Sequence, residues 1–441
     1  MTSRMPNIVK RPKPLDSSAT TAARHGVAQL TLVEHSLCPL HSSGIGDVSR
    51  THVSQFAYRD PSGRKQTGTA RVYCPKGLLP SDEFFLWGLL ALTCSQPKLE
   101  PEFHATPHYI LRELGVIDTG SRGGKNYQLF RQALARLAAV TYQCDRFYDP
   151  IRREHADVSF GFLSYRLPLD PHSSRAWRIV WDSLFLEMVG AVGGRLTFDL
   201  ETYRGLDAAS RRLFLLLQKV FWRRRVSPVF DVRHLAIDVL GFSPSLSQPD
   251  LNRKVKTVAQ RLLAQRLIAL PPGVTDPAEL VQRMGRGDFR VQFVRGAYFD
   301  RPAQRPNRAT TERSPLFEVL QSVGLEVAAI GRILAQNEHS LVREWADITL
   351  AAKERFGEQF FRRSSQAYFL DNLKHARTGR RQPPDWWREL NKSEQRQQDQ
   401  AVWQSISNLF PAPTVDPAKK AASPGGLQRI GTLVVSTKQS S

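Results

Sequence analysis

The sequence predicts an α+β protein, mainly helical, with two winged-helix-like domains in tandem, flexible tails and a small C-terminal helical region. Three patterns lead to this prediction: recognisable helix caps, apolar residues at helical spacing, and strand-like pairs that follow groups of helices. A chain of 441 residues is long enough for two or three domains. The predicted parts are a disordered basic arm (1–48), the two domains (49–190 and 191–300), a linker (301–314), a helical region (315–390) and a disordered tail (391–441).

The first predicted domain has three helices and a hairpin. The helices are expected over 84–93, 108–114 and 126–139, and the hairpin strands over 141–148 and 158–167. Ser81 is the expected cap of the first helix, and Thr106 with Pro107 forms a cap and first-turn pair for the second, which Gly115 ends. Three helices followed by a two-stranded ribbon outline a winged helix.

The second predicted domain repeats this plan less clearly. It contains a strand over 195–200, a helix after Asp207, a short helix over 232–240, a long helix over 251–267 and a strand over 291–294. The helix after Asp207 has apolar residues at positions i, i+3, i+4, i+7 and i+8, which are Leu213, Leu216, Leu217, Val220 and Phe221. That stripe faces a core. Asp250 is the expected cap of the long helix.

The chain is strongly basic. Its 62 Lys and Arg residues against 41 Asp and Glu residues produce a net charge of +21, which concentrates polyanions around the protein. Charge alone does not separate DNA from RNA, from a ribosome or from a membrane surface. The sequence contains no run of eighteen apolar residues and begins without a secretory signal, so we expect a cytoplasmic protein without a membrane partner.

Two predicted helices carry a polar and basic face opposite their apolar seam. The candidate DNA-binding residues on them are Lys125, Gln128, Gln132 and Arg136 on one helix, and Arg253, Lys256, Thr257 and Gln260 on the other. Arginine and lysine can pair with guanine, and glutamine with adenine, in the major groove. The alternative is an ordinary solvated helix face. Arg152 and Arg153, at the hairpin tip, can contact phosphates or enter a minor groove.

Motifs for nucleotide binding are incomplete. The segment from Gly120 to Lys125 is one residue too short for a phosphate loop, and Asn126 replaces the Ser or Thr that would hold magnesium. His104 and His108 flank the start of a helix and lack the H-E-x-x-H arrangement. We therefore expect no cofactor and no enzymatic activity.

The cysteines are scattered and form no Cys-x-x-Cys pair. His35, Cys38 and His41 are three residues apart, but a fourth metal ligand would have to come from elsewhere. We expect no metal site.

Several segments resemble the replication initiator protein A family of plasmids. They are Phe84-Phe-Leu-Trp87, the stretches 105–115 and 124–137, and the later stretches 196–203 and 210–221. Their order and spacing also agree with the family, over roughly 80–270. The resemblance implies winged-helix domains that bind repeated origin sites on double-stranded DNA, and recruitment of host replication proteins such as a helicase or initiator. It implies no catalytic residue.

Three other interpretations remain open at this point. A sequence-specific transcriptional regulator usually has a single reading domain and acts as a dimer, and a homodimer is also possible for this chain. An RNA-binding or ribosome-associated protein would be expected to show aromatic stacking platforms on a sheet. A hydrolase is the third, because a catalytic triad need not be visible in sequence.

Overall fold

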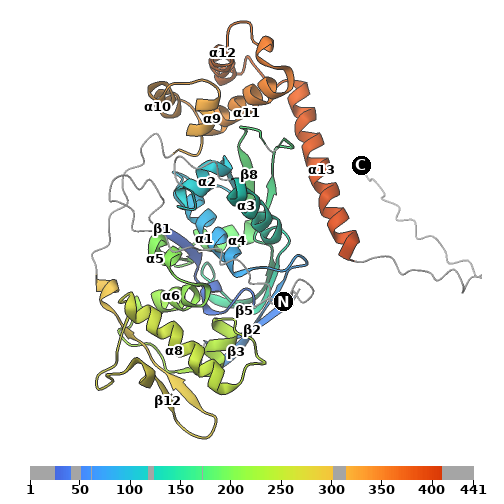
Figure 1. Ribbon diagram of the computed structural model, residues 1–441. Coiled ribbons are helices and arrows are strands. Elements are labelled where there is room, and N and C mark those ends of the chain that lie inside the picture. Colours follow the sequence, from blue (N-terminus) through green and yellow to red (C-terminus); the bar gives the residue numbers. More distant parts are fainter. Residues whose placement is uncertain are drawn as a thin grey trace, which may run out of the picture. The chain divides into compact units, whose positions relative to one another are not determined.

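The computed structural model describes residues 25–40, 51–60, 62–117, 124–170, 172–300 and 314–409 (Figure 1). These residues form an α+β fold of helices and several small antiparallel sheets. The described residues up to Arg396 form one compact unit, and the end of α13 (Asp385–Leu409), from Gln397 to Leu409, belongs to another.

Two parts of the fold share one topology. We name residues 80–181 the first module; it contains α1 (Pro80–Cys94), β4 (Glu102–Ala105), α2 (Pro107–Glu113), α3 (Gly124–Leu137), β7 (Leu163–Arg166) and β8 (Trp177–Trp181). The second module, 208–291, contains α6 (Ala208–Phe221), β10 (Phe230–Asp231), α7 (Val232–His234) with a π-helical turn (Leu235–Val239), α8 (Gln248–Ala264), β12 (Val281–Arg283) and β13 (Phe289–Val291). Their sheets have the orders β4-β8-β7 and β10-β13-β12, so the last strand lies between the other two in both.

Local capping determines where the module helices begin. The hydroxyl of Thr106 accepts a hydrogen bond from the Tyr109 amide, and Asp207 accepts one from Ser210, both at 3.1 Å, as the sequence predicts. Two predicted caps are wrong. Pro80 is preset for the first helical position, so α1 begins ahead of Ser81, and α8 begins after Ser247 rather than after Asp250.

The hairpin predicted after α3 exists but belongs to another sheet. It joins β5 (Thr141–Asp149) to β6 (Glu154–Phe160), and both lie in a four-stranded sheet with β2 (Thr51–Arg59) and β3 (Lys65–Tyr73), of order β2-β3-β5-β6. The strand expected over 158–167 is divided, because the chain leaves this sheet after Phe160 and enters the first module's sheet at Leu163. The strand expected over 291–294 is likewise divided between two sheets.

The expected N-terminal arm is partly folded. β1 (His25–Gln29) pairs with β9 (Arg195–Asp199), and the side chain of Gln29 accepts hydrogen bonds from two following backbone amides. Val33 and Leu37 are buried in the same core. The prediction of a disordered arm is therefore wrong for 25–40, because long-range strand pairing orders this segment; 1–24 and 41–50 lie outside the described residues.

The remaining elements connect these parts. They are the helices α4 (Ser183–Gly190) and α5 (Leu200–Gly205), the strands β11 (Ile268–Ala269) and β14 (Val294–Arg295), and 3-10 turns at Leu32–Glu34, Pro277–Leu280, Ala297–Asp300 and Glu358–Phe360.

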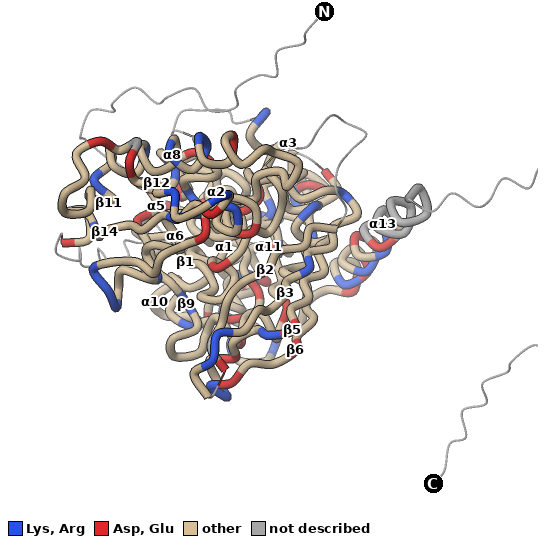
Figure 2. Tube along the Cα trace, turned by 90° about the horizontal axis from the view of Figure 1, so that it is seen from below, with Lys and Arg blue, Asp and Glu red and all other residues tan. Residues whose placement is uncertain are grey.

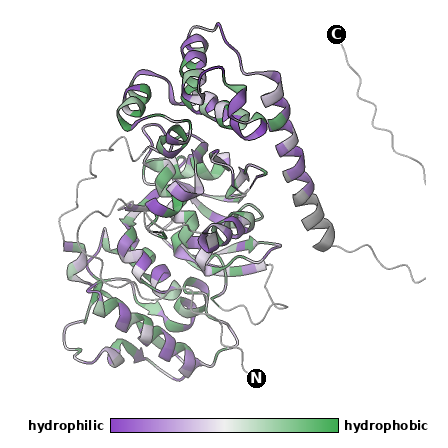
Figure 3. Ribbon diagram, turned by 45° about the horizontal axis from the view of Figure 1, so that its top comes forward, coloured by the Kyte–Doolittle hydropathy of each residue, from purple (hydrophilic) through white to green (hydrophobic). Residues whose placement is uncertain are grey.

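A single hydrophobic core runs through both modules, from Val27 to Phe293. The boundary predicted at 190 therefore divides residues that pack together. A second core, between Leu316 and Leu373, belongs to the C-terminal helices, and Figure 3 colours hydrophobic residues green in both parts of the fold.

The C-terminal module, 314–396, is helical as expected. It contains α9 (Phe317–Ser322), α10 (Val327–Gln336), α11 (His339–Phe356), α12 (Ser365–Arg377) and the first half of α13 (Asp385–Leu409). The disordered tail expected from 391 is wrong for 391–409, because α13 continues through these residues. Glu394 is 2% exposed and pairs with Arg175, which anchors this part of the helix. The predicted linker is outside the described residues over 301–313.

A buried ion pair joins the first helices of the two modules. Arg212 of α6 donates to Glu83 of α1 at 2.5 Å, to the Leu240 carbonyl at 2.7 Å and to Cys38 Sγ at 3.1 Å. Burial by itself would lower the pKa of Arg212, but the adjacent Glu83 carboxylate raises it. Arg212 therefore stays charged in the core.

Replacing Arg212 should destabilise the protein strongly. We expect Arg212→Met to lower the free energy of unfolding by about 3–5 kcal/mol, because Glu83 is left as an uncompensated buried charge. Adding Glu83→Gln should restore part of that loss, and Arg224→Met, at an exposed arginine, should change little. Chemical denaturation measures all three. A double variant less stable than Arg212→Met alone would contradict this account.

One buried and one half-buried histidine, His35 and His52, lie close to each other at the four-stranded sheet. His35 Nε2 is 2.9 Å from the Tyr142 hydroxyl, and His52 Nε2 is 2.8 Å from the Ser36 hydroxyl. Burial lowers the pKa of each histidine to about 4. Both are therefore neutral in the folded protein at pH 7.

This burial predicts acid sensitivity. In the unfolded chain His35 binds a proton below about pH 6.5, whereas in the folded protein it binds one only below about pH 4. The contribution of neutral His35 to the unfolding free energy is therefore complete above pH 6.5 and is lost as the pH falls towards 4. We expect His35 to account for a loss of about 2 kcal/mol in unfolding free energy by pH 5. Denaturant titrations at pH 7 and pH 5 should show a smaller loss in His35→Gln than in wild type or in His172→Gln, an exposed control. Equal losses in all three proteins would refute the role of His35.

Candidate nucleic-acid interface

Helix α3 separates an apolar side from a polar side. Phe130, Leu134 and Leu137 are buried, and the Phe130 ring stacks on Trp177 of β8 with centroids 5.6 Å apart. The predicted residues Lys125, Gln128 and Gln132 are exposed on the other side. No Asp or Glu occurs within Gly124–Leu137, so no carboxylate on the helix opposes an approaching phosphate.

Arg136 does not belong to this exposed face. Its guanidinium donates two hydrogen bonds, at 2.7 and 2.8 Å, to the buried carboxylate of Asp82, whose other contact is the Leu79 amide at the start of α1. Arg136, predicted as a DNA-binding residue, is half-buried, and the bidentate pair uses its guanidinium inside the module. Arg131, which is not among the predicted DNA-binding residues, is exposed beside Gln132.

Helix α8 has the same division. Its buried seam contains Leu251, Val255, Val258, Ala259 and Leu262. On the other side Arg253 and Gln260 are exposed, while Lys256 and Thr257 are half-buried. Asp250, the helix's one acidic residue, pairs with Arg253 at 2.7 Å, but both side chains are open to solvent and such pairs are weak.

Helices α3 and α8 both lie near the upper edge of Figure 2, which also marks basic residues on α8. The shared core and the Glu83–Arg212 pair hold the modules that carry these helices.

The two hairpin tips differ from the prediction. Arg152 and Arg153 are exposed in the β5–β6 turn, but this hairpin is part of the four-stranded sheet and not of the first module's sheet. The β12–β13 hairpin of the second module was missed. It exposes Arg283 and Arg286 around a turn whose sequence, Gly285-Arg-Gly-Asp288, is a recognisable hairpin signal.

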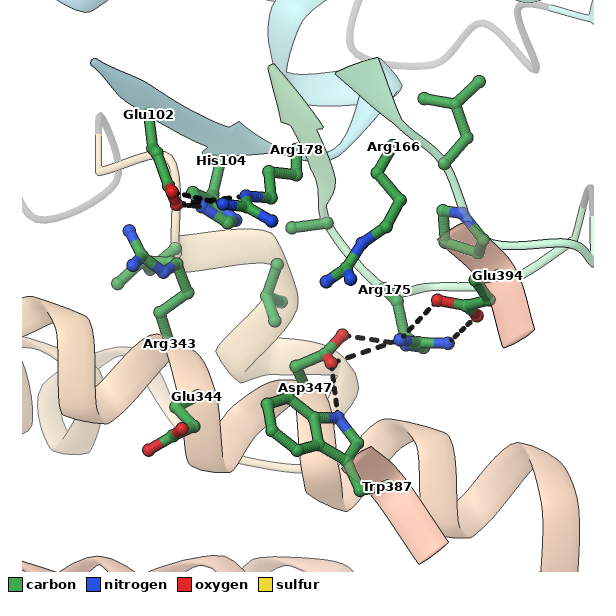
Figure 4. Close-up of a pocket in the computed structure, with 15 residues that line it drawn as sticks. Glu102, His104, Arg166, Arg175, Arg178, Arg343, Glu344, Asp347, Trp387 and Glu394 are labelled. Carbon is green, nitrogen blue, oxygen red and sulfur yellow. Dashed lines mark hydrogen bonds and ion pairs between the residues drawn. The ribbon is translucent and has the colours of Figure 1, made fainter. Parts of the chain in front are cut away.

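A pocket lies between the sheet of the first module and the C-terminal helices (Figure 4). Most of its charged groups pair with one another. Glu102 binds Arg178 and His104, and the pKa of Glu102 is lowered by His104 first and then by Arg178. Arg175 binds both Asp347 and Glu394, at 2.8 and 2.6 Å. These contacts are structural ion pairs, and we see no arrangement of a nucleophile with a base in the pocket lining.

Other predicted or excluded sites can be placed as well. His35 and Cys38 contact different partners, Tyr142 and the Glu83–Arg212 pair, and the described part of the chain contains no cluster of three His, Cys, Asp or Glu side chains suited to a metal ion. Residues 118–123, with most of the glycine-rich segment, and His41 lie outside the described residues. Among the described helices none has the length and apolar character to cross a bilayer.

Comparisons with known proteins find little. No family model matches the chain, and no curated protein matches it. Among solved structures, a crystal structure of domains 2 and 3 of RctB is similar at 13% sequence identity and a TM-score of 0.35, covering 58% of this chain and 94% of that one. A likeness at this level does not define the fold.

The different positions of Arg131 and Arg136 generate a prediction about stability. Arg136→Gln should lower the free energy of unfolding by about 3 kcal/mol, because Asp82 loses its bidentate partner inside the module. The same substitution at exposed Arg131, on the same helix, should change it by less than about 0.5 kcal/mol. Thermal or denaturant unfolding of the two variants measures the difference. Equal stabilities would show that the Asp82–Arg136 pair contributes nothing.

Proposed function

We propose that this protein is a plasmid-type replication initiator that binds repeated sites on double-stranded origin DNA and recruits host replication proteins. The observation that carries the proposal is the repeated topology: helix, strand, helix, helix and two strands, with the last strand in the middle of each sheet. We interpret each module as a winged helix, in which α3 and α8 are the helices that enter the major groove.

The exposed side chains support this interpretation. The α3 face has Lys125, Gln128 and Gln132 without any carboxylate, and the α8 face has Arg253 and Gln260. These side chains have the hydrogen-bonding groups that read purine edges. The net charge of +21 favours capture of a polyanion. Because one hydrophobic core holds α3 and α8, the two helices could enter two neighbouring stretches of the DNA major groove.

The replication role comes from the sequence resemblance. The segments similar to the replication initiator protein A family, such as 105–115 and 124–137, coincide with α2 and α3, and 210–221 lies in α6. In this proposal the protein binds and distorts DNA, at a cost of a few kcal/mol that its DNA contacts offset, and host enzymes unwind it. The protein itself is proposed to have no catalytic role.

Binding to DNA can be tested at a single residue. Arg253→Ala should weaken binding to the specific site by about 1–3 kcal/mol if Arg253 meets a base, and relax the preference at that position. Footprinting on DNA upstream of the protein's own gene, with affinities measured at several salt concentrations, provides the measurement. Arg332→Ala, at an exposed arginine of α10, is the matched control for lost charge. Identical binding of Arg253→Ala and wild type on all sequences would exclude this assignment.

The replication role needs a separate readout. A DNA circle that carries this gene and its flanking repeats, and no other replication gene, should be maintained in a suitable host. Footprints on direct repeats without such maintenance would favour a transcriptional regulator instead. No preference for duplex over single strands at moderate salt would contradict both.

A further inference from the structure

The C-terminal module touches the first module through ion pairs and hydrogen bonds, and also through apolar side chains such as Leu316 and Val319, which line the pocket between them. It has its own hydrophobic core, separate from the core of the two modules, and Ala176 is the first-module residue that packs against it. Parts of a chain that have separate cores usually can move relative to one another. The contacts can therefore be exchanged for other partners without opening either core.

One carboxylate of the C-terminal module contacts three polar side chains of α2 and of the residue that caps it. Glu318, in α9, accepts hydrogen bonds from the Thr106 hydroxyl and, at 2.9 Å, from the Arg112 guanidinium. Its carboxylate also lies 2.8 Å from His108 Nδ1. The same carboxylate acts on Tyr127 in α3, whose pKa is raised by burial first and by Glu318 second. Glu318 therefore lies next to the proposed reading helix.

A second group of carboxylates surrounds the loop between β7 and β8. Asp347 of α11 and Glu394 of α13 both bind Arg175, and Glu354 accepts from the Ser173 hydroxyl and the Ser174 amide, at 2.8 and 3.1 Å. Figure 4 shows Arg175 between its two acidic partners. In the proposed winged helix this loop is the wing.

The covered groups are of the kind that bind phosphates. Arginine, hydroxyl and backbone N–H donors make most protein contacts to the DNA backbone. Arg166 adds to them: it points into the pocket in Figure 4, and within the described part of the chain it forms no ion pair. Burial, and then Arg178, lowers the pKa of Arg166, so an anion at this place would be favourable.

We propose that the C-terminal module and duplex DNA compete for one surface of the first module, made by Thr106, His108, Arg112 and Arg175. The carboxylates of Glu318, Asp347 and Glu394 occupy on it the positions of DNA phosphates. This inference rests on the proposed DNA-binding function. Binding of DNA along α3 then requires the C-terminal module to leave, and the docked form has the lower affinity for DNA.

The two partners of one ion pair provide the test. In the full-length protein Glu318→Gln weakens docking and leaves the DNA surface intact, so affinity for a labelled duplex from upstream of the gene rises about fivefold or more. Arg112→Gln breaks the same pair but removes a phosphate contact, so affinity falls about fivefold or more. A purely structural pair would shift both variants in the same direction, which overturns the proposal.

The control separates docking from net charge. Glu326→Gln removes one negative charge from an exposed position of the same module and should leave affinity within about twofold of wild type. If Glu318→Gln and Glu326→Gln change affinity equally while wild type binds the duplex, the competition is refuted and the DNA-binding function stands. If neither wild type nor Glu318→Gln binds the duplex, the proposed function itself fails.

A second measurement does not depend on affinity. Carbodiimide labelling of carboxylates, followed by mass spectrometry, reports how accessible Glu318, Asp347 and Glu394 are in the wild-type protein. Addition of saturating duplex should increase their labelling severalfold, because the module that carries them leaves the surface. Unchanged or decreased labelling of these three residues would overturn the proposal.

Discussion

The buried pair of Glu83 and Arg212 fixes the arrangement on which the rest of the molecule depends. Burying two charges is costly, and the cost is offset only by good geometry and by further hydrogen bonds, here to the Leu240 carbonyl and Cys38 Sγ. A guanidinium has a rigid fork of donors, so the contact specifies direction as well as distance. Because α1 packs on α3 and α6 on α8, fixing α1 against α6 also fixes the two exposed helices.

Arginine has two distinct uses in this chain, and only one of them faces outward. Arg136, Arg175 and Arg212 are paired with carboxylates inside the fold or between modules, where they contribute to stability and position. Arg131 and Arg253 are exposed on helices. A net charge of +21 describes both groups together and so does not locate a binding surface. A binding surface is located by the arginines whose guanidinium groups are not already paired with carboxylates in the fold.

Local signals in the sequence were sufficient to predict most helices and to predict which sides of α3 and α8 are exposed. The caps at Thr106 and Asp207 and the apolar seam from Leu251 depend on residues a few positions apart. The partner of Arg136 is 54 residues away, and β1 pairs with a strand about 170 residues later, so neither is visible in local patterns. The same limit explains why the β5–β6 hairpin was assigned to the wrong sheet.

The contrast between the molecule's interfaces has a physical consequence. The first and second modules share an apolar core, which would expose large hydrophobic surface on separation, and are held as one body. The C-terminal module contacts the first module through Glu318, Asp347 and Glu394. Arg175 and Glu394 are as buried as Arg212 and Glu83, so separating them is costly unless another anion takes the place of the carboxylate. In the proposed competition, DNA phosphates take the places of these carboxylates, and the shared apolar core keeps α3 and α8 in the same relative positions.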